Sequence, residues 1–168
     1  MIFMDREFLD KINESTSIPD IFEIVKEVVR KTIGRSRAGL ELGLSELGSH
    51  PQGLLGAYYV SGSNMIVMNQ TPLRRIQETD PKLLNPYIFS ILLHEYIHSM
   101  GFFNEEQVRK LTYEISKETF GKNNVITELA KDLKKFLPNL CYPEALPKID
   151  GPVRKVKDFD KSSIRYIG

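Results

Sequence analysis

The sequence predicts an α+β domain in which N-terminal helices precede a small sheet and further helices follow it. Apolar residues recur at helical spacing before residue 34 and again after residue 85, whereas apolar and polar residues alternate between residues 40 and 69. Prolines recur after residue 137, and few apolar pairs are found there. We therefore expect a domain over residues 1–137 and an extended tail over residues 138–168, which either wraps the domain or lies across its substrate cleft.

Two helices are expected first, a short one over residues 5–13 and a longer one that begins at Ser17 and ends at Gly34. Alternation around Leu40–Ser45 and the segments LLGAYYV (54–60) and MIVMN (65–69) predict a three-stranded, mainly antiparallel sheet, with a turn at SGSN. Only helices are expected in the rest of the domain. The pair Asn85-Pro86 predicts the start of a buried helix that ends at Gly101, Asn104 and Gln107 begin the next, and a last helix runs over residues 124–137.

The composition indicates a soluble globular protein, with 41% hydrophobic and 27% charged residues in a chain of 168. A formal net charge of +1 creates no strong field toward nucleic acid or a membrane surface, and no stretch approaches the roughly 20 apolar residues of a membrane span. The single cysteine, Cys141, favours a reducing compartment. We expect a cytoplasmic protein with neither a nucleic-acid nor a membrane partner.

The buried helix carries the sequence His94-Glu95-Tyr96-Ile97-His98, which has the pattern H-E-x-x-H. A spacing of four residues places both imidazoles on one helix face, where two ring nitrogens can bind one metal ion. Glu95 is rotated about 100° from His94, so its carboxylate can take a proton from a metal-bound water. Two histidines and a glutamate that merely fill a core would each require separate polar partners. One bound metal ion would offset the free-energy cost of burying all three groups. The segment predicts one Zn²⁺ ion, with Glu95 as the general base and Tyr96 and Ile97 as packing residues.

With its helices, small sheet and H-E-x-x-H helix, the chain resembles the zincin metallopeptidases over roughly residues 17–120. The segment HEYIHSMG is also similar to the metzincin signature, although Asn104 stands where that signature has its third histidine and no methionine follows for a Met-turn. The resemblance implies a zinc-dependent peptidase that hydrolyses a peptide or protein substrate.

The third ligand is expected among three glutamates of the following helix. Small cytoplasmic zincin-like proteins carry an acidic residue near the position of Glu105, which also begins a helix close to His98. Glu118 has the spacing of the thermolysin-like gluzincins, 20 residues after the second histidine, but overshoots His94 in a tight helical hairpin. Glu114 is nearer but sits at the edge of the inward face. We expect Glu105, with Glu114 and Glu118 as alternatives.

Two functions are consistent with these residues. The first is a zinc metallopeptidase in which an extended substrate pairs with an edge strand such as LLGAYYV. The second is a non-catalytic zincin-like module that holds a metal and binds a protein partner. Tyr58, Tyr59 and Tyr113 are further candidates for stabilising an oxyanion, and His50 is a candidate for the same role or for binding metal. Cys141 is expected to be a small buried residue or a thiolate that closes the metal site.

Overall fold

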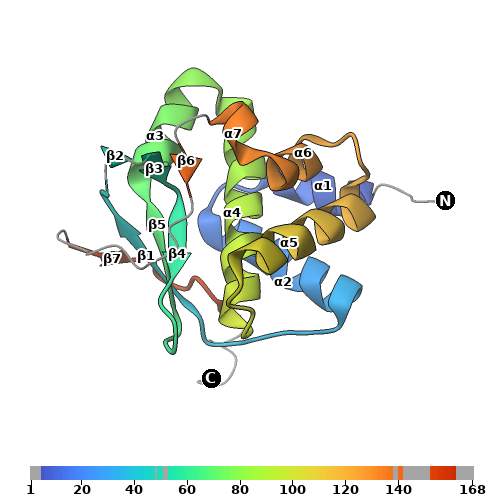
Figure 1. Cartoon of the computed structure of the whole chain (residues 1–168), viewed down its shortest axis with the longest axis horizontal. Coiled ribbons are helices and arrows are strands. Elements are labelled where there is room, and N and C mark those ends of the chain that lie inside the picture. The colour runs from blue at the N-terminus through green and yellow to red at the C-terminus, as the bar shows by residue number, and fades with distance from the viewer. Residues whose placement is uncertain (1–4, 48, 51–52, 138–139, 142–151, 162–168) are drawn as a thin grey trace.

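Helix α4 (Leu84–Ser99) runs through the middle of the molecule, with the sheet on one side and helices on the other (Figure 1). The structure, a computed structural model, describes residues 5–47, 49–50, 53–137, 140–141 and 152–161. Of the 16 residues in α4, 13 are buried, as the nearly continuous apolar sequence predicts. The predicted α+β class is confirmed. No helix in these ranges is long and apolar enough to cross a bilayer.

Most helices begin and end where local sequence predicts. Ser17 accepts a hydrogen bond from the backbone N–H of Asp20, and Gly34 ends the same helix with a φ of 68°. Asn104 likewise accepts a hydrogen bond from the N–H of Gln107. The remaining helices are α1 (Arg6–Glu14), α2 (Ile18–Ile33), α3 (Gln70–Thr79), the 3₁₀ helix η1 (Pro81–Leu83), α5 (Glu105–Phe120), α6 (Val125–Lys131) and α7 (Leu133–Phe136).

Three helix predictions are wrong in detail. Asn85 does not cap α4, which begins one residue earlier; its Nδ2 instead donates to the carbonyls of Ile12 and Ser15 at the end of α1. Helix α3 was not predicted, because it buries only Pro72 and Ile76 and so lacks an apolar stripe. The last predicted helix is interrupted at Asp132, whose non-helical backbone separates α6 from α7.

The main sheet has four strands in the order β4-β5-β1-β7, one more than predicted, and two of its three pairings are antiparallel. The β4–β5 hairpin is antiparallel as predicted, but β5 pairs in parallel with β1, with Glu41 opposite Met65. Strand β4 lies beyond β5 from β1, at the edge of the sheet, although it comes between β1 and β5 in the chain. These strands are β1 (Glu41–Ser45), β4 (Ala57–Tyr59), β5 (Met65–Asn69) and β7 (Arg154–Lys155).

A second small sheet is formed by three short strands in the order β2-β3-β6. Strand β6, from the C-terminal tail, pairs in parallel with β3, the first part of the predicted strand 54–60. Between residues 70 and 137 the elements are helices alone, as predicted, and the late strands both lie in the tail. The three strands are β2 (Ser49–His50), β3 (Gly53–Leu55) and β6 (Leu140–Cys141).

The described part of the tail closes the other edge of the main sheet. Strand β7 is antiparallel to β1, and the N–H of Val156 donates to the carbonyl of Leu42. A Cβ on Gly43 would lie 2.3 Å from Val153 Cγ1, so glycine allows the tail to approach this closely. Strand β1 is consequently buried on both faces, although its alternating sequence predicts a half-buried strand.

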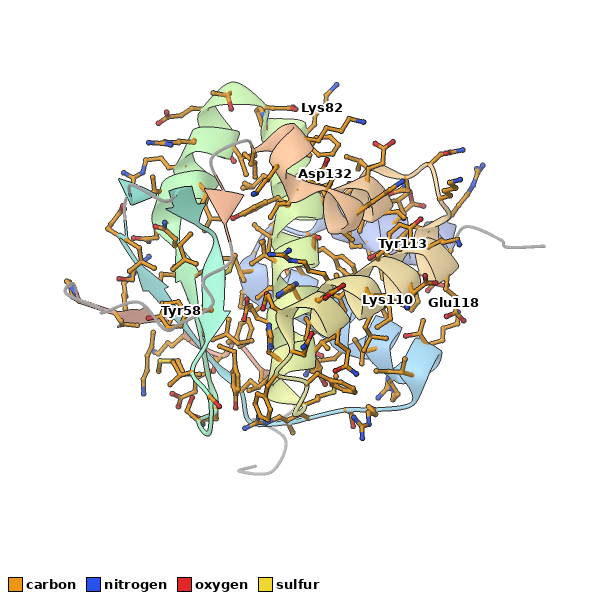
Figure 2. All side chains as sticks on the ribbon, in the orientation of Figure 1. Tyr58, Lys82, Lys110, Tyr113, Glu118 and Asp132 are labelled. Carbon is orange, nitrogen blue, oxygen red and sulfur yellow. The ribbon has the colours of Figure 1, made fainter. Side chains whose placement is uncertain are left out.

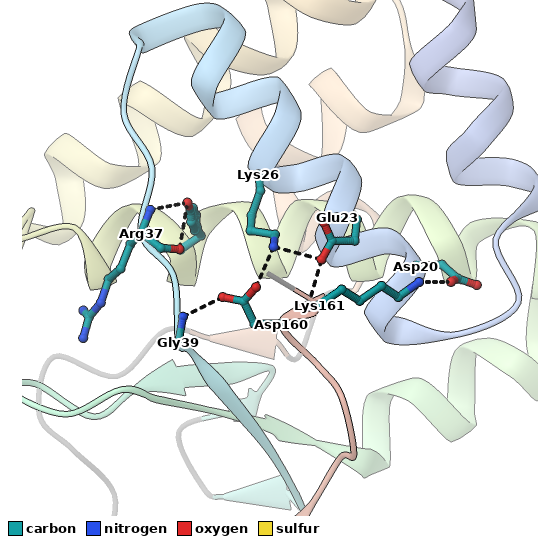
Figure 3. A network of polar contacts seen from close by, with 8 residues as sticks. Asp20, Glu23, Lys26, Arg37, Gly39, Asp160 and Lys161 are labelled. Carbon is teal, nitrogen blue, oxygen red and sulfur yellow. Dashed lines mark hydrogen bonds and ion pairs between the residues drawn. The ribbon is translucent and has the colours of Figure 1, made fainter. Parts of the chain in front are cut away.

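Buried side chains anchor the end of this segment to α2 (Figure 3). The ring of Phe159 stacks on Phe22, with centroids 4.0 Å apart. Asp160, 2% exposed, accepts hydrogen bonds from Lys26 Nζ at 2.6 Å and from the Gly39 N–H at 2.8 Å. Residues 152–161 thus wrap the domain and share its core.

Candidate metal centre

His94 and His98 lie one turn apart on α4, as the four-residue spacing predicts. Their ring centroids are 5.0 Å apart. The side chain of His94 is 2% exposed and that of His98 is 13% exposed, so both imidazoles are largely removed from water. Gly101, with a φ of 102°, allows the chain to reverse and bring α5 back against α4.

Glu105, the first residue of α5, places its carboxylate between the two imidazoles. Its Oε1 lies 2.5 Å from His94 Nε2, and its Oε2 lies 2.8 Å from His98 Nε2. The candidate ligand atoms of the three residues all lie within 4.8 Å of one another. Two imidazole nitrogens and one carboxylate oxygen at this separation can bind a metal ion.

The alternative third ligands lie elsewhere. Glu114 and Glu118 are exposed on α5, and Figure 2 shows Glu118 near the C-terminal end of that helix. Glu105 faces the histidines because the turn after α4 is only five residues long, so the helical hairpin is tight. Within the described ranges, His94, His98 and Glu105 form the one group of three or more possible ligands at metal-binding separation.

The backbone orients one of the imidazoles. His98 Nδ1 lies 2.7 Å from the carbonyl oxygen of Phe102, where it donates a hydrogen bond. This bond keeps the proton of a neutral imidazole on Nδ1 and leaves Nε2, the nitrogen that faces Glu105, available as a ligand. The role of Phe102 could not be read from its side chain, since a backbone carbonyl carries no residue-specific signal.

Burial and mutual hydrogen bonds shift the ionisation of the three groups. Burial opposes ionisation of Glu105, but the hydrogen bonds from both histidines prevail and lower its pKa to about 2. Burial lowers the pKa of His94. Burial also opposes the charging of His98, yet the hydrogen bond to Glu105 and the nearby carboxylates raise its pKa. An ionised carboxylate and an unprotonated His94 are the forms in which these residues bind a metal.

Glu95 points from α4 toward the sheet and does not join the three-residue group. It is 2% exposed, and the backbone N–H of Tyr59 on β4 donates a hydrogen bond to its carboxylate. Burial raises the pKa of Glu95 to about 8. A cation held by the adjacent histidines would lower this pKa, because it favours the charged form.

The other predicted candidates lie outside the group. Tyr58 is buried on the sheet face opposite α4 with Leu55 and Val67, and burial raises its pKa to about 12. The hydroxyl of Tyr59 donates to the carbonyl of Ser63, and Tyr113 lies half-buried on α5 (Figure 2). The structure describes the backbone of His50 and Cys141, in β2 and β6, but not their side chains.

One residue that the sequence did not single out belongs beside the group. The guanidinium of Arg109, one helical turn after Glu105, is close enough to His94 to contribute to the lowering of its pKa. Arg109 lies four residues after Glu105, so the two side chains share a face of α5. The sequence could have indicated Arg109 only if Glu105 had already been known as the third ligand.

Comparison with known proteins adds no relative: no family model, curated protein or solved structure matches the chain.

Proposed function

We propose that this protein is a zinc-dependent peptidase in which His94, His98 and Glu105 hold the ion and Glu95 is the general base. The observation that supports the proposal is that these three side chains converge beside Glu95, which is buried and is not one of the candidate ligands. Two histidines and one carboxylate are a donor set of catalytic zinc sites, which keep a position open for substrate. A cytoplasmic setting, favoured by the single cysteine, is part of the same proposal.

The metal and the protein would contribute different chemistry. Zinc, when bound, polarises a carbonyl group and makes water more acidic. The carboxylate of Glu95 takes a proton from the attacking water and then delivers it to the nitrogen of the departing amine. A cation held by His94 and His98 would favour the ionised form of Glu95, which is the form that accepts this proton.

Strand β4 is the element against which an extended peptide would lie. Val60 donates to Met65 and Asn69 donates to Gly56, so the ladder to β5 uses every second residue. Ala57 and Tyr59 consequently direct their backbone groups toward the edge of the sheet that no described strand covers, and the N–H of Tyr59 is bonded to Glu95. A peptide that added to this edge would be held next to the base.

The alternative is a metal-holding module that binds a protein partner without cleaving it. The low exposure of Glu95, 2%, is the observation that favours this alternative, because a base must reach water and substrate. Metal content alone does not separate the two functions, whereas hydrolysis does.

The test combines metal analysis of the purified full chain with a peptide-library cleavage assay. We expect about one zinc per chain, its loss in His94→Ala and His98→Ala, and cleavage of some library peptides by the wild type. Glu95→Gln should keep the zinc and lose hydrolysis, because an amide cannot accept the proton. Glu106→Gln, an exposed neighbour of Glu105, is the matched control and should behave as wild type.

Two outcomes would contradict the proposal. Unchanged zinc content in both histidine variants would exclude the metal centre. A wild type that binds zinc but cleaves no library peptide would favour the binding module.

A further inference from the structure

A cavity of about 300 Å³ lies beside His94, between α4, α5 and the α6–α7 segment. Its inner wall is formed by His94, by the hydroxyl residues Ser90 and Thr112, and by Leu129, all of which are buried. This volume is at the lower end of the range for small-molecule sites, so it suits one side chain or one terminal group of a peptide. His94 also belongs to the metal centre. A group bound in the cavity would therefore be separated from the metal only by the His94 side chain.

The rim of the cavity carries an excess of positive charge. Arg109, Lys131 and Lys134 contribute cations from three different helices, and Asp132 contributes one anion. All four are exposed, and Figure 2 shows Asp132 where α6 meets α7. The excess of two positive charges is local, since the whole chain has a net charge of only +1. Such a cleft attracts anionic groups and concentrates them near its walls.

Arg109 connects this charge to the metal centre. Arg109 and His94 both line the cavity, so a group bound there can contact the guanidinium and the imidazole together. A guanidinium binds a carboxylate through two parallel hydrogen bonds, whereas the flexible lysines of the rim act as point charges. Among the rim residues, Arg109 is therefore the one able to orient a carboxylate as well as attract it.

We infer that this cavity is a carboxylate-binding subsite, which selects substrates with a carboxylate next to the scissile bond. Its role as a substrate subsite rests on the proposed peptidase function, whereas its affinity for carboxylates does not. The carboxylate can belong to an Asp or Glu side chain, which would make the protein an endopeptidase of acidic sites. It can also be the α-carboxylate of the last residue, which would make it a carboxypeptidase.

Binding is tested without catalysis, by NMR titration of the metal-free, ¹⁵N-labelled full chain. The probes are N-acetylglutamate α-amide and N-acetylalanine, each paired with its neutral amide, N-acetylglutamine α-amide or N-acetylalanine amide. We expect the charged probe of at least one pair to shift the backbone signals of Leu129 and Ala130, and the pair that responds identifies the source of the carboxylate. Equal shifts with the neutral probes, or none with either acid, would overturn the inference.

Matched variants assign the binding to the rim. Arg109→Glu should weaken binding of the charged probe about tenfold or more, and Arg109→Lys should restore part of it. Lys110→Glu makes the same charge change at the neighbouring exposed position on α5, outside the cavity, and should bind as wild type (Figure 2). If Lys110→Glu weakens binding as much as Arg109→Glu, general electrostatic attraction explains the result and the subsite is refuted.

Hydrolysis by the zinc-loaded protein tests the role in specificity. Peptides that carry Glu next to the scissile bond, or a free C-terminal carboxylate there, should be cleaved about tenfold faster than their neutral counterparts, and Arg109→Glu should abolish the difference. Cleavage without this preference would refute the specificity role and leave the peptidase proposal intact. Carboxylate binding without any cleavage would refute the peptidase and support the cavity as a carboxylate site.

Discussion

The proposed role of Glu105 as third ligand leads to a prediction that three glutamates on one helix can test. Replacing Glu105 by Gln removes the carboxylate that lies between the two imidazoles, at 2.5 and 2.8 Å from their Nε2 atoms. Glu114→Gln and Glu118→Gln make the same chemical change at exposed positions of α5 and serve as controls. Only the first change should affect zinc binding, because only Glu105 shares a site with His94 and His98.

The expected magnitude follows from the linkage between binding and folding. Zinc at 100 times its dissociation constant stabilises the folded wild type by about 2.7 kcal/mol. For a chain of this length, about 2–4 °C per kcal/mol converts this into a rise of roughly 5–11 °C in Tm. Loss of a residue that only hydrogen-bonds a metal ligand already weakens affinity about 10–100-fold, so loss of a ligand should reach at least the upper value. At the same zinc concentration, Glu105→Gln would then be stabilised by only about 0.4 kcal/mol.

The assay is thermal unfolding of chelator-treated protein with and without zinc, followed by circular dichroism. Each variant is compared with its own metal-free form, since Glu105→Gln also loses the two hydrogen bonds that its carboxylate makes without metal. The controls should retain the full zinc-dependent rise in Tm. The reasoning is refuted if Glu105→Gln retains this rise, or if Glu114→Gln or Glu118→Gln loses it.

Three further predictions concern stability. Phe159→Ala should lower the free energy of unfolding by about 3–5 kcal/mol in urea titrations, because the ring is 2% exposed and stacks on Phe22. Truncation after Leu137 should likewise lower Tm without a gain in hydrolysis, and a truncated chain that is stable and more active would instead support a tail that restrains the active site. The third prediction concerns acid. The hydrogen bond from Lys31 holds the pKa of Asp5 below its usual 3.8, so Asp5 stabilises the fold above that pH. This contribution is lost as the pH falls through the lower pKa of the folded state. Asp5→Asn should therefore lose less stability than wild type between pH 5 and pH 2 in urea titrations, by no more than about 1 kcal/mol for so exposed a pair, and an equal loss in both proteins would contradict this assignment.

Local sequence determined the parts of this protein whose physics is local. A spacing of four on a helix is enough to bring His94 and His98 together, because helical geometry fixes which side chains share a face. The limits of α2 and the start of α5 follow from the hydrogen-bonding capacity of Ser17 and Asn104 and from the freedom of Gly34 to adopt a positive φ. The burial of α4 follows from its nearly continuous apolar sequence.

Tertiary structure decided everything that depends on which segments meet. Alternation identifies a strand but not its neighbour, so the parallel pairing of β1 with β5 and the addition of β7 could not be read from sequence. Asn85 has the chemistry of a cap, and only the packing of α1 against α4 shows that it caps the end of α1 instead. The choice of Glu105 over Glu114 and Glu118 likewise rests on the tight reversal after α4, since three glutamates of one helix have the same chemistry and differ only in where the fold places them.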